Sequence, residues 1–424
     1  MTTFQLSAWI ALGLLVQAGV LLGIASWRHR LRFRLTQKEI TVSLNATMPS
    51  TSYVAPVAQL HGWKGFRRFR VERSVFEDEA KQVCSFYLVP ADGQVLTPFL
   101  PGQYLTFQLE VPGYGQAAKT ITRCYSISDS PNPAHYRISV KRVPSPDPSG
   151  ITPGLASNHF HDNVIAGSVL HVMAPAGKFY IDVGDMPVVL IGAGIGITPM
   201  MCMLLWCLEH QPGRKVSLYY GVRNPTEHAF MSVLEDLAER NSQFSICVVY
   251  SDAAHPSVFS DKNHYFGQID VALLKQTLPH GPHQFYVCGP TAMMESLVPA
   301  LAQWGVPLTD IHFEAFGPAS IRLVAQQPTA NQADALTAQP TLEIRFKASQ
   351  RLLTWDKQKT NLLDFAESHG IAVESGCRAG SCGCCATPLL SGEVVYEHAP
   401  DFELLPGQCL LCVGKPASAL VLGL

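Results

Sequence analysis

The chain has 424 residues, too many for a single hydrophobic core, so we expect two to four domains. Its formal net charge of −2 excludes the strongly basic surface of a nucleic-acid-binding protein, and we expect no nucleic-acid partner. The 12 cysteines gather toward the C-terminus without a disulfide pattern, which favours a reducing compartment for most of the chain.

An uncharged, apolar segment runs from Phe4 to Trp27. As a helix its 24 residues would span roughly 36 Å, enough to cross a bilayer. The basic run Arg28–Arg34 follows it, whereas a signal peptide carries its positive charge first. Because basic residues stay in the cytoplasm, we expect a single-pass transmembrane helix over residues 4–27 in the inner (cytoplasmic) membrane, with the rest of the chain in the cytoplasm. A cleaved signal peptide and a buried helix are the alternatives.

The remaining chain divides into segments of different character. Residues 28–64 combine the basic stop with a tether rich in Thr, Ser and Pro. Short alternating runs such as SFYLVP and QYLTFQLEV indicate an antiparallel β-barrel over residues 65–183. Continuous apolar strands alternate with helical segments over residues 184–318, which is typical of an α/β domain with a parallel sheet. A low-complexity linker, 319–340, precedes a small mixed domain, 341–424.

Two motifs in the barrel segment could bind a ligand with a flat ring and a phosphate. Arg123-Cys124-Tyr125-Ser126 ends a strand about twenty residues after Tyr104. It offers a guanidinium for a phosphate, an aromatic face and a hydroxyl for a ring nitrogen. Gly154-Leu155-Ala156-Ser157 is a turn of mostly small residues entering a short helix, which can present backbone N–H groups to a pyrophosphate. A strand with a surface arginine is the alternative for the first motif.

The α/β segment holds a glycine-rich turn from Gly192 to Pro199, between a buried strand and a helix. Its glycines would let the backbone approach a dinucleotide, although Pro199 takes the place of the last glycine of G-x-G-x-x-G. Tight packing of strand on helix is the alternative. Cys288-Gly289-Pro290 ends a later strand, at the edge where such sheets bind ligands. A buried small side chain is the alternative for Cys288.

Three cysteines near the C-terminus, Cys377, Cys382 and Cys385, follow the C-x4-C-x2-C spacing of plant-type [2Fe-2S] proteins. Cys412 or Cys409 would be the fourth ligand. Structural zinc would instead pair its thiols in two separated C-x2–4-C knuckles, so the spacing favours iron–sulfur.

In collinear order, the motifs RCYSISDSP, GLASNHFHD, APAGKFYID, LIGAGIGITPM, YYGVR, VCGP and EAFGP resemble the ferredoxin–NADP reductase superfamily, in particular the reductase module of flavohaemoglobins, over about residues 65–318. The C-terminal segment resembles plant-type ferredoxin domains, fused as in phthalate-dioxygenase-reductase-like and hybrid-cluster-protein reductases. The implied fold is a β-barrel FAD domain, a parallel α/β nucleotide domain and a β-grasp ferredoxin-like α+β domain, behind the membrane helix. Flavohaemoglobins carry an N-terminal globin that this chain lacks, so haem chemistry is not implied.

The resemblance also implies roles for individual residues. One set would hold FAD, with Tyr125 against the isoalloxazine and Ser126 near its N5: Tyr104, Arg123, Cys124, Tyr125, Ser126, Gly154, Ala156 and Ser157. A second set would hold NADH, with NADPH as the alternative: Gly194, Ile195, Gly196, Ile197, Thr198, Pro199, Gly289 and Pro290. An end segment would cover the flavin until nicotinamide displaces it: Phe316, Gly317 and Pro318. Three residues are expected at the reacting atoms: Ser126, Cys288 and Glu314. The ligand pattern aligns Cys412, rather than Cys409, with Cys377, Cys382 and Cys385.

These features predict a membrane-anchored NAD(P)H-dependent electron-transfer reductase. It would pass hydride from NADH to FAD, and then single electrons through the [2Fe-2S] cluster to a partner oxygenase, desaturase, cytochrome or hybrid-cluster protein. Asp252 follows the third strand of the α/β domain and would repel a 2′-phosphate, which favours NADH. A redox or nitric oxide sensor without a turnover partner is the alternative.

Overall fold

The computed structural model describes residues 62–63, 65–111, 119–143, 154–252, 264–316, 342–356, 359, 361–376, 378, 380, 382–396, 400 and 402–424. The predicted transmembrane helix 4–27, nearly all of the tether and the linker 319–340 lie outside the described residues. Within the described part of the chain, no helix is both long and apolar enough to cross a membrane.

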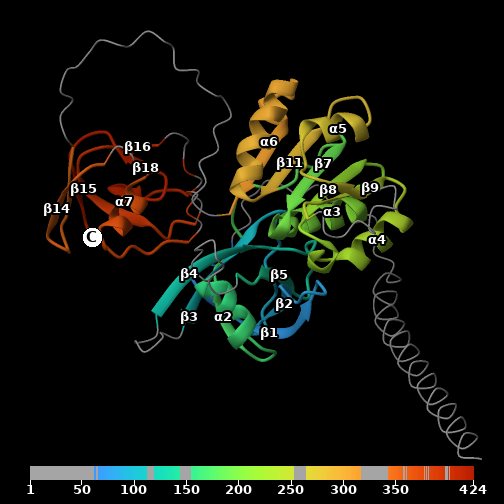
Figure 1. Cartoon of the computed structure of the whole chain (residues 1–424). Coiled ribbons are helices and arrows are strands. Elements are labelled where there is room, and N and C mark those ends of the chain that lie inside the picture. The colour runs from blue at the N-terminus through green and yellow to red at the C-terminus, as the bar shows by residue number, and fades with distance from the viewer. Residues whose placement is uncertain are drawn as a thin grey trace, which may run out of the picture. The chain divides into compact units, whose positions relative to one another are not determined.

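The first domain is an antiparallel barrel, as predicted. Its strands are β1 Arg67–Phe76, β2 Val83–Pro90, β3 Tyr104–Val111, β4 Lys119–Ser126, β5 Tyr136–Lys141 and β6 Val169–Val172. They hydrogen-bond in the order β4-β3-β6-β1-β2-β5, and Figure 1 shows the helix α2, Leu155–Asn163, beside these strands. A bridge between Ile127 and Ile138 joins the end of β4 to β5, so that the two edge strands meet and the sheet closes.

Alternation along the strands fills the barrel with apolar side chains. In β1, Phe69 and Val71 are fully buried while the residues between and beside them are exposed. The helix α2 packs its Phe160 against Phe86 and Phe107, with ring centroids 5.2 and 5.5 Å apart. This packing positions the beginning of α2 beside the strands that carry the predicted flavin residues.

The second domain is an α/β domain with a parallel sheet, again as predicted. Its strands are β7 Val188–Ala193, β8 Val216–Val222, β9 Phe244–Tyr250, β10 His264–Phe266, β11 Gln284–Gly289 and β12 Ile311–Ala315, in the order β10-β9-β8-β7-β11-β12. Its helices are α3 Ile197–His210, α4 Met231–Arg240, α5 Val271–Thr277 and α6 Thr291–Trp304. The core residues place α3 and α4 on one face of the sheet and α5 and α6 on the other. The strand order reverses between β7 and β11, and ligands bind at such a switch point.

The C-terminal domain is a small α+β unit. Its strands are β13 Glu343–Phe346, β14 Arg351–Thr354, β15 Ala386–Ser391, β16 Val394–Tyr396, β17 Gln408–Leu410, β18 Gly414–Pro416 and β19 Leu420–Leu422. Five of them form a mixed sheet, β14-β13-β19-β15-β17, and β16 pairs with β18. The helix α7, Leu362–Ser368, begins at Asn361, whose side chain accepts a hydrogen bond from the Asp364 backbone. Phe346 and Phe365 are fully buried in the core between sheet and helix.

One buried arginine fixes the segment that connects the barrel to the α/β domain. Arg214 is only 3% exposed and donates hydrogen bonds to the carbonyls of Asp182 and Met186 and to the side chain of Gln284. The hydroxyl of Tyr286 accepts a hydrogen bond from the Asp182 backbone. Because a buried guanidinium needs several acceptors, these contacts hold one arrangement of the connection.

Candidate functional site

Two neighbouring strands of the barrel bring Tyr104 and Ser126 directly opposite each other, at the beginning of β3 and the end of β4. Both residues are 4% exposed. The Ser126 hydroxyl has no hydrogen-bond partner among the described residues. Leaving a buried polar group unpaired costs about 1–3 kcal/mol. The position therefore fits a ligand atom that completes the hydrogen bond.

Tyr104 is held in place by the turn that follows β6. Its backbone N–H donates to the Ala176 carbonyl and its carbonyl accepts from the Ala176 N–H, each at 3.0 Å. Gly177 has φ +111°, and a Cβ on it would lie 2.9 Å from the Tyr104 ring. Gly177 belongs to the motif APAGKFYID, but nothing in this local pattern shows that a glycine 73 residues away packs on the Tyr104 ring.

The other residues of the Arg123–Ser126 motif divide between the two faces of β4. Side chains alternate along a strand, so Arg123 and Tyr125 share one face while Cys124 and Ser126 share the other. The Tyr125 ring lies edge-on to Phe160, with centroids 5.1 Å apart, and burial raises the pKa of its phenol. The Cys124 thiol lies 3.2 Å from the Thr106 hydroxyl. The motif thus presents a hydroxyl and an aromatic ring on opposite faces.

The beginning of α2 could hold an anion, as the sequence predicted. Gly154 precedes the helix and contributes no side-chain cap, and the first turn has no acidic residue. Ala156 and Ser157 are buried, and the Ser157 hydroxyl donates to the Gly154 carbonyl over 3.1 Å. The first backbone N–H groups of a helix lack intrahelical acceptors, which suits a pyrophosphate.

The glycine-rich turn and the end of β11 meet at the switch point of the α/β sheet. Gly194 has φ +53°, and a Cβ on Gly196 would lie 2.2 Å from the Cys288 carbonyl oxygen. Only glycine can therefore occupy position 196 without displacing the backbone of β11. Ile197 begins α3, and Thr198 donates its hydroxyl to the Ile195 carbonyl over 2.9 Å.

Pro199 lies in the first turn of α3, where no backbone N–H is required. The alternative of tight strand–helix packing also has support, because a Cβ on Gly192 would lie 3.1 Å from the Ile197 Cα. The turn thus combines tight packing at Gly192 with a close approach to β11 at Gly196.

Cys288 and Glu314 are paired in register on β11 and β12. Cys288 is fully buried, and desolvation, reinforced by the charge of Glu314, raises the pKa of its thiol. The thiol therefore stays protonated and can donate a weak hydrogen bond, but it cannot serve as a nucleophilic thiolate. Phe316 follows β12 and is 42% exposed, whereas Gly317 and Pro318 lie outside the described residues.

The C-terminal domain brings three of the four predicted cluster ligands into one region. Cys382, Cys385 and Cys412 are each at most 7% exposed. A hydrogen bond with the Cys412 thiol lowers the pKa of Cys385, and this effect outweighs the charge of Cys382, which acts to raise that pKa. Cys377 lies outside the described residues. Thiols are the ligand type that a [2Fe-2S] cluster needs, but among the described residues no three His, Cys, Asp or Glu side chains are placed together to hold a metal ion.

Cys409 occupies a different environment. It lies in β17 opposite Thr387 of β15, is 1% exposed, and burial raises the pKa of its thiol to about 12. A ligand thiol must lose its proton, so this environment suits a core side chain better than an iron ligand. The geometry favours Cys412 for the fourth position.

Two segments match known family models. Residues 190–298 match the oxidoreductase NAD-binding domain, and residues 346–417 match the 2Fe-2S iron-sulfur cluster binding domain. A flavohemoprotein of Oceanobacillus iheyensis is 39% identical over 261 residues, which cover 61% of this chain and 61% of that protein. The chain thus spans about three-fifths of the length of that relative.

Two solved structures extend the match. The flavohem-like FAD/NAD binding domain of the nitric oxide dioxygenase from Vibrio cholerae is 32% identical, with a TM-score of 0.52, and the match covers 60% of this chain and 99% of that one. This chain belongs to the ferredoxin–NADP reductase family. Phthalate dioxygenase reductase is 26% identical with a TM-score of 0.51, and the match covers 85% of this chain and 98% of that one. The family member therefore carries its reductase module and its iron–sulfur domain in one chain.

The comparisons confirm the cofactors and the enzyme class that the sequence predicted. The chain is an NAD(P)H-dependent electron-transfer oxidoreductase with FAD and a [2Fe-2S] cluster. The buried Ser126 hydroxyl fits the FAD ring, and the close approach of Gly196 to β11 fits a dinucleotide at the switch point. The roles of the individual site residues remain predictions.

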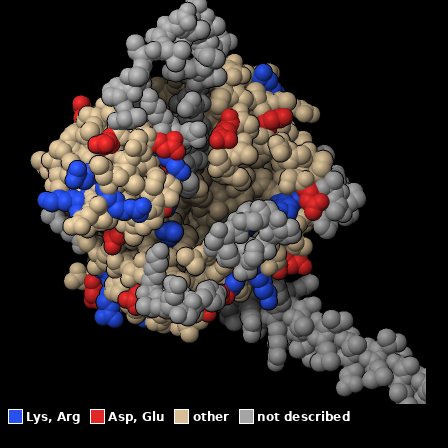
Figure 2. Space-filling view, turned by 60° about the vertical axis from the view of Figure 1, so that its left-hand side comes forward, with Lys and Arg blue, Asp and Glu red and all other residues tan. Residues whose placement is uncertain are grey.

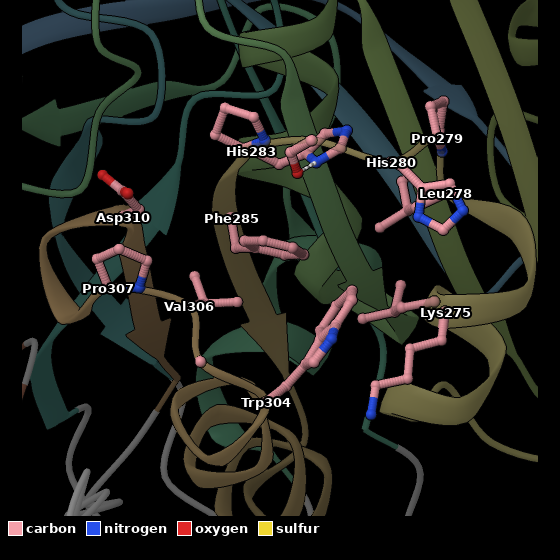
Figure 3. A pocket seen from close by; sticks show the side chains of 14 residues that line it. Lys275, Leu278, Pro279, His280, His283, Phe285, Trp304, Val306, Pro307 and Asp310 are labelled. Atoms are coloured by element: carbon pink, nitrogen blue, oxygen red, sulfur yellow. Dashed lines mark hydrogen bonds between the residues drawn. The ribbon is translucent and has the colours of Figure 1, made fainter.

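A hollow of about 650 Å³ lies at the opposite edge of the α/β sheet, where β11 and β12 begin. Figure 3 shows the Trp304 and Phe285 rings on its inner side, and the Lys275 ammonium lies 5.5 Å from the Trp304 ring centroid. Figure 2 shows charged side chains of both signs scattered between wide neutral areas on one face of the molecule. We assign the hollow no part in coenzyme binding, because the glycine turn lies at the other end of the strands.

Proposed function

We propose that this family member takes electrons from NADH and passes them one at a time to a partner protein. The candidate partners are an oxygenase, a desaturase, a cytochrome and a hybrid-cluster protein. The order of its modules supports the proposal, because phthalate dioxygenase reductase is described as a modular structure for electron transfer from pyridine nucleotides to [2Fe-2S]. When bound, FAD supplies hydride acceptance and release of single electrons, and the cluster supplies one-electron transfer.

The observation that carries the proposal is the buried Ser126 hydroxyl opposite Tyr104, without a partner among the described residues. We infer that this hydroxyl orients the flavin ring through a hydrogen bond at a ring nitrogen. Gly194 to Pro199 would hold the coenzyme pyrophosphate against the end of β11. The protonated Cys288 thiol, beside Glu314, would line the approach of the nicotinamide and exclude water.

Replacing Ser126 by alanine should slow reduction of the bound flavin by NADH about 10- to 100-fold, because a hydrogen bond to a charge-developing group is worth about 1.5–3 kcal/mol. Stopped-flow loss of flavin absorbance at saturating NADH measures this rate. The Ser126→Thr variant keeps the hydroxyl and should retain most of it. Equal rates for wild type and Ser126→Ala would remove Ser126 from the reaction. A wild-type protein whose flavin NADH does not bleach would contradict the proposed function itself.

We further propose that residues 4–27 anchor the chain in the inner membrane and that the partner lies at or in the membrane. The uncharged run and the basic cluster after it support this proposal. A chain lacking residues 1–35 is expected in the soluble fraction, with FAD bound and NADH oxidation intact, while the full chain sediments with membranes. Recovery of the full chain in the soluble fraction after cell lysis would rule out the anchor.

A further inference from the structure

We propose that Glu227 favours NADH in this reductase by neutralising Arg223, the one lysine or arginine in the described segments after β7 to β10 that could bind the 2′-phosphate of NADPH. The inference rests on the proposed NADH-dependent function and deepens it. Two backbone hydrogen bonds join the segments that follow β8 and β9: the Ser251 N–H donates to the Val222 carbonyl over 3.0 Å, and the Asp252 N–H donates to the Arg223 carbonyl over 2.9 Å. Arg223 and Asp252 thus border the same part of the carboxyl edge.

This part of the sheet is where the adenosine end of a coenzyme is expected. In open parallel sheets the dinucleotide lies across the carboxyl edge, with its pyrophosphate at the first glycine turn and its adenosine ribose beyond the next strand. Here the glycine turn follows β7 and the next strand is β8. Side chains after β8 and β9 are therefore the ones that meet a ribose hydroxyl or its phosphate.

Arg223 is the only lysine or arginine in the described segments that follow β7 to β10, namely 194–196, 223–230, 251–252 and 267–270. Its side chain is 68% exposed, so it could reach a ligand. The same segments contain the carboxylates Glu227, Asp252 and Asp270. Within these described segments, a 2′-phosphate would thus meet one guanidinium and three carboxylates.

Glu227 forms an ion pair with the Arg223 guanidinium. Its Oε1 lies 3.3 Å from Arg223 Nη1 and its Oε2 lies 3.0 Å from Lys141 Nζ of β5. The Glu227 side chain is 7% exposed, and the turn that carries it is fixed by the Asn224 side chain, which accepts from the Glu227 backbone over 3.2 Å. The carboxylate is therefore held in place, and Arg223 folds back onto it.

The charge balance discriminates between the two coenzymes. A phosphate monoester carries close to two negative charges, and its recognition needs a guanidinium that is free to bind it. The two cations Arg223 and Lys141 are offset by Glu227 and the neighbouring Asp252. The adenosine ribose of NADH has only hydroxyl groups there, and a carboxylate readily accepts a hydrogen bond from a ribose hydroxyl. The arrangement favours NADH.

The test is the Glu227→Gln variant of the full chain with its cofactors bound. Releasing Arg223 should raise the ratio of kcat/KM for NADPH to that for NADH about tenfold, the size of one charge-assisted hydrogen bond to an exposed group. The gain should come from a lower KM for NADPH, with kcat unchanged, because the 2′-phosphate is remote from the reacting atoms. Binding of 2′,5′-ADP should tighten by the same factor, while binding of 5′-AMP stays constant.

Three further variants control for the other effects of the change. Lys141→Met removes the second partner of Glu227 but leaves its pair with Arg223, so it should not move the coenzyme ratio. Arg223→Ala combined with Glu227→Gln should abolish the gain. Glu227→Gln combined with Lys141→Met removes the lysine that would lose its carboxylate, and it should show the full shift even where the single variant folds poorly.

The outcomes separate the inference from the proposed function. A wild-type protein that oxidises neither coenzyme contradicts the function. Three results overturn the inference alone while NADH oxidation persists: a wild-type preference for NADPH, an unchanged ratio in both Glu227→Gln variants, or an equal shift when Arg223 is also removed.

Discussion

Replacing Cys412 by serine should abolish the visible absorbance of the [2Fe-2S] cluster while leaving FAD bound. The Cys412 thiol is hydrogen-bonded to Cys385 in the cluster region, and a plant-type cluster needs four thiolates. The Cys409→Ser variant should keep both cofactors, because that thiol lies within β17 and its pKa is raised to about 12 by burial. Cys412 and Cys409 thus form a matched pair of buried thiols three residues apart.

Three measurements on the purified variants decide between the two thiols: iron per chain, absorbance of the oxidised protein and the electron paramagnetic resonance signal after reduction. NADH should still bleach the flavin of Cys412→Ser, whereas electron delivery to cytochrome c should fall to background. Loss of the cluster in Cys409→Ser with retention in Cys412→Ser would reverse the ligand assignment. Retention in both variants would place the fourth ligand elsewhere, and Cys384 would then be the first thiol to replace.

Replacing Gly196 by alanine should weaken coenzyme binding and destabilise the α/β domain. The added Cβ would lie 2.2 Å from the Cys288 carbonyl oxygen and 2.9 Å from the Gly289 Cα, both of them backbone atoms that cannot turn away. Overpacking of this kind typically costs about 1–3 kcal/mol of folding stability. Moving β11 away from the turn would also open the switch point, and we expect the dissociation constant for NADH to rise by at least about tenfold.

Gly213→Ala is the matched control, because a Cβ at that position meets no atom within 4 Å and φ lies outside the left-handed range. It should leave both the melting temperature and NADH binding unchanged. Isothermal titration with NAD+ and thermal unfolding followed by flavin fluorescence report the two effects separately. If Gly196→Ala keeps wild-type NADH binding and stability, β11 can move aside for the added Cβ. The close approach of Gly196 to β11 would then not be required for function.

The sequence predicted the barrel, the parallel sheet and the mixed C-terminal domain because each has a strong local pattern. The continuous apolar run before Gly192 and the alternation in QYLTFQLEV both correspond to observed strands. The barrel closure through Ile127 and Ile138 and the packing of Gly177 on Tyr104 could not be predicted. Such contacts depend on how distant segments meet, and no local pattern records them.

The candidate site, too, could be predicted only in part. Its motifs were recognisable because glycines and cysteines carry specific spacings, and the structure places Tyr104 beside Ser126 and the glycine turn beside Cys288. The pairing of Arg223 with Glu227 was not predicted. An arginine and a glutamate four residues apart suggest a helical pair, yet here a short 3₁₀ turn after β8 brings them together.

The buried Arg214 has a consequence for how the coenzyme enters. It holds the carbonyls of Asp182 and Met186 together with Gln284, so the connection between the barrel and the α/β domain has no free pivot. We expect the two domains to behave as one rigid body during turnover. The geometry for hydride transfer would then be set when the chain folds rather than by a hinge that closes on the coenzyme.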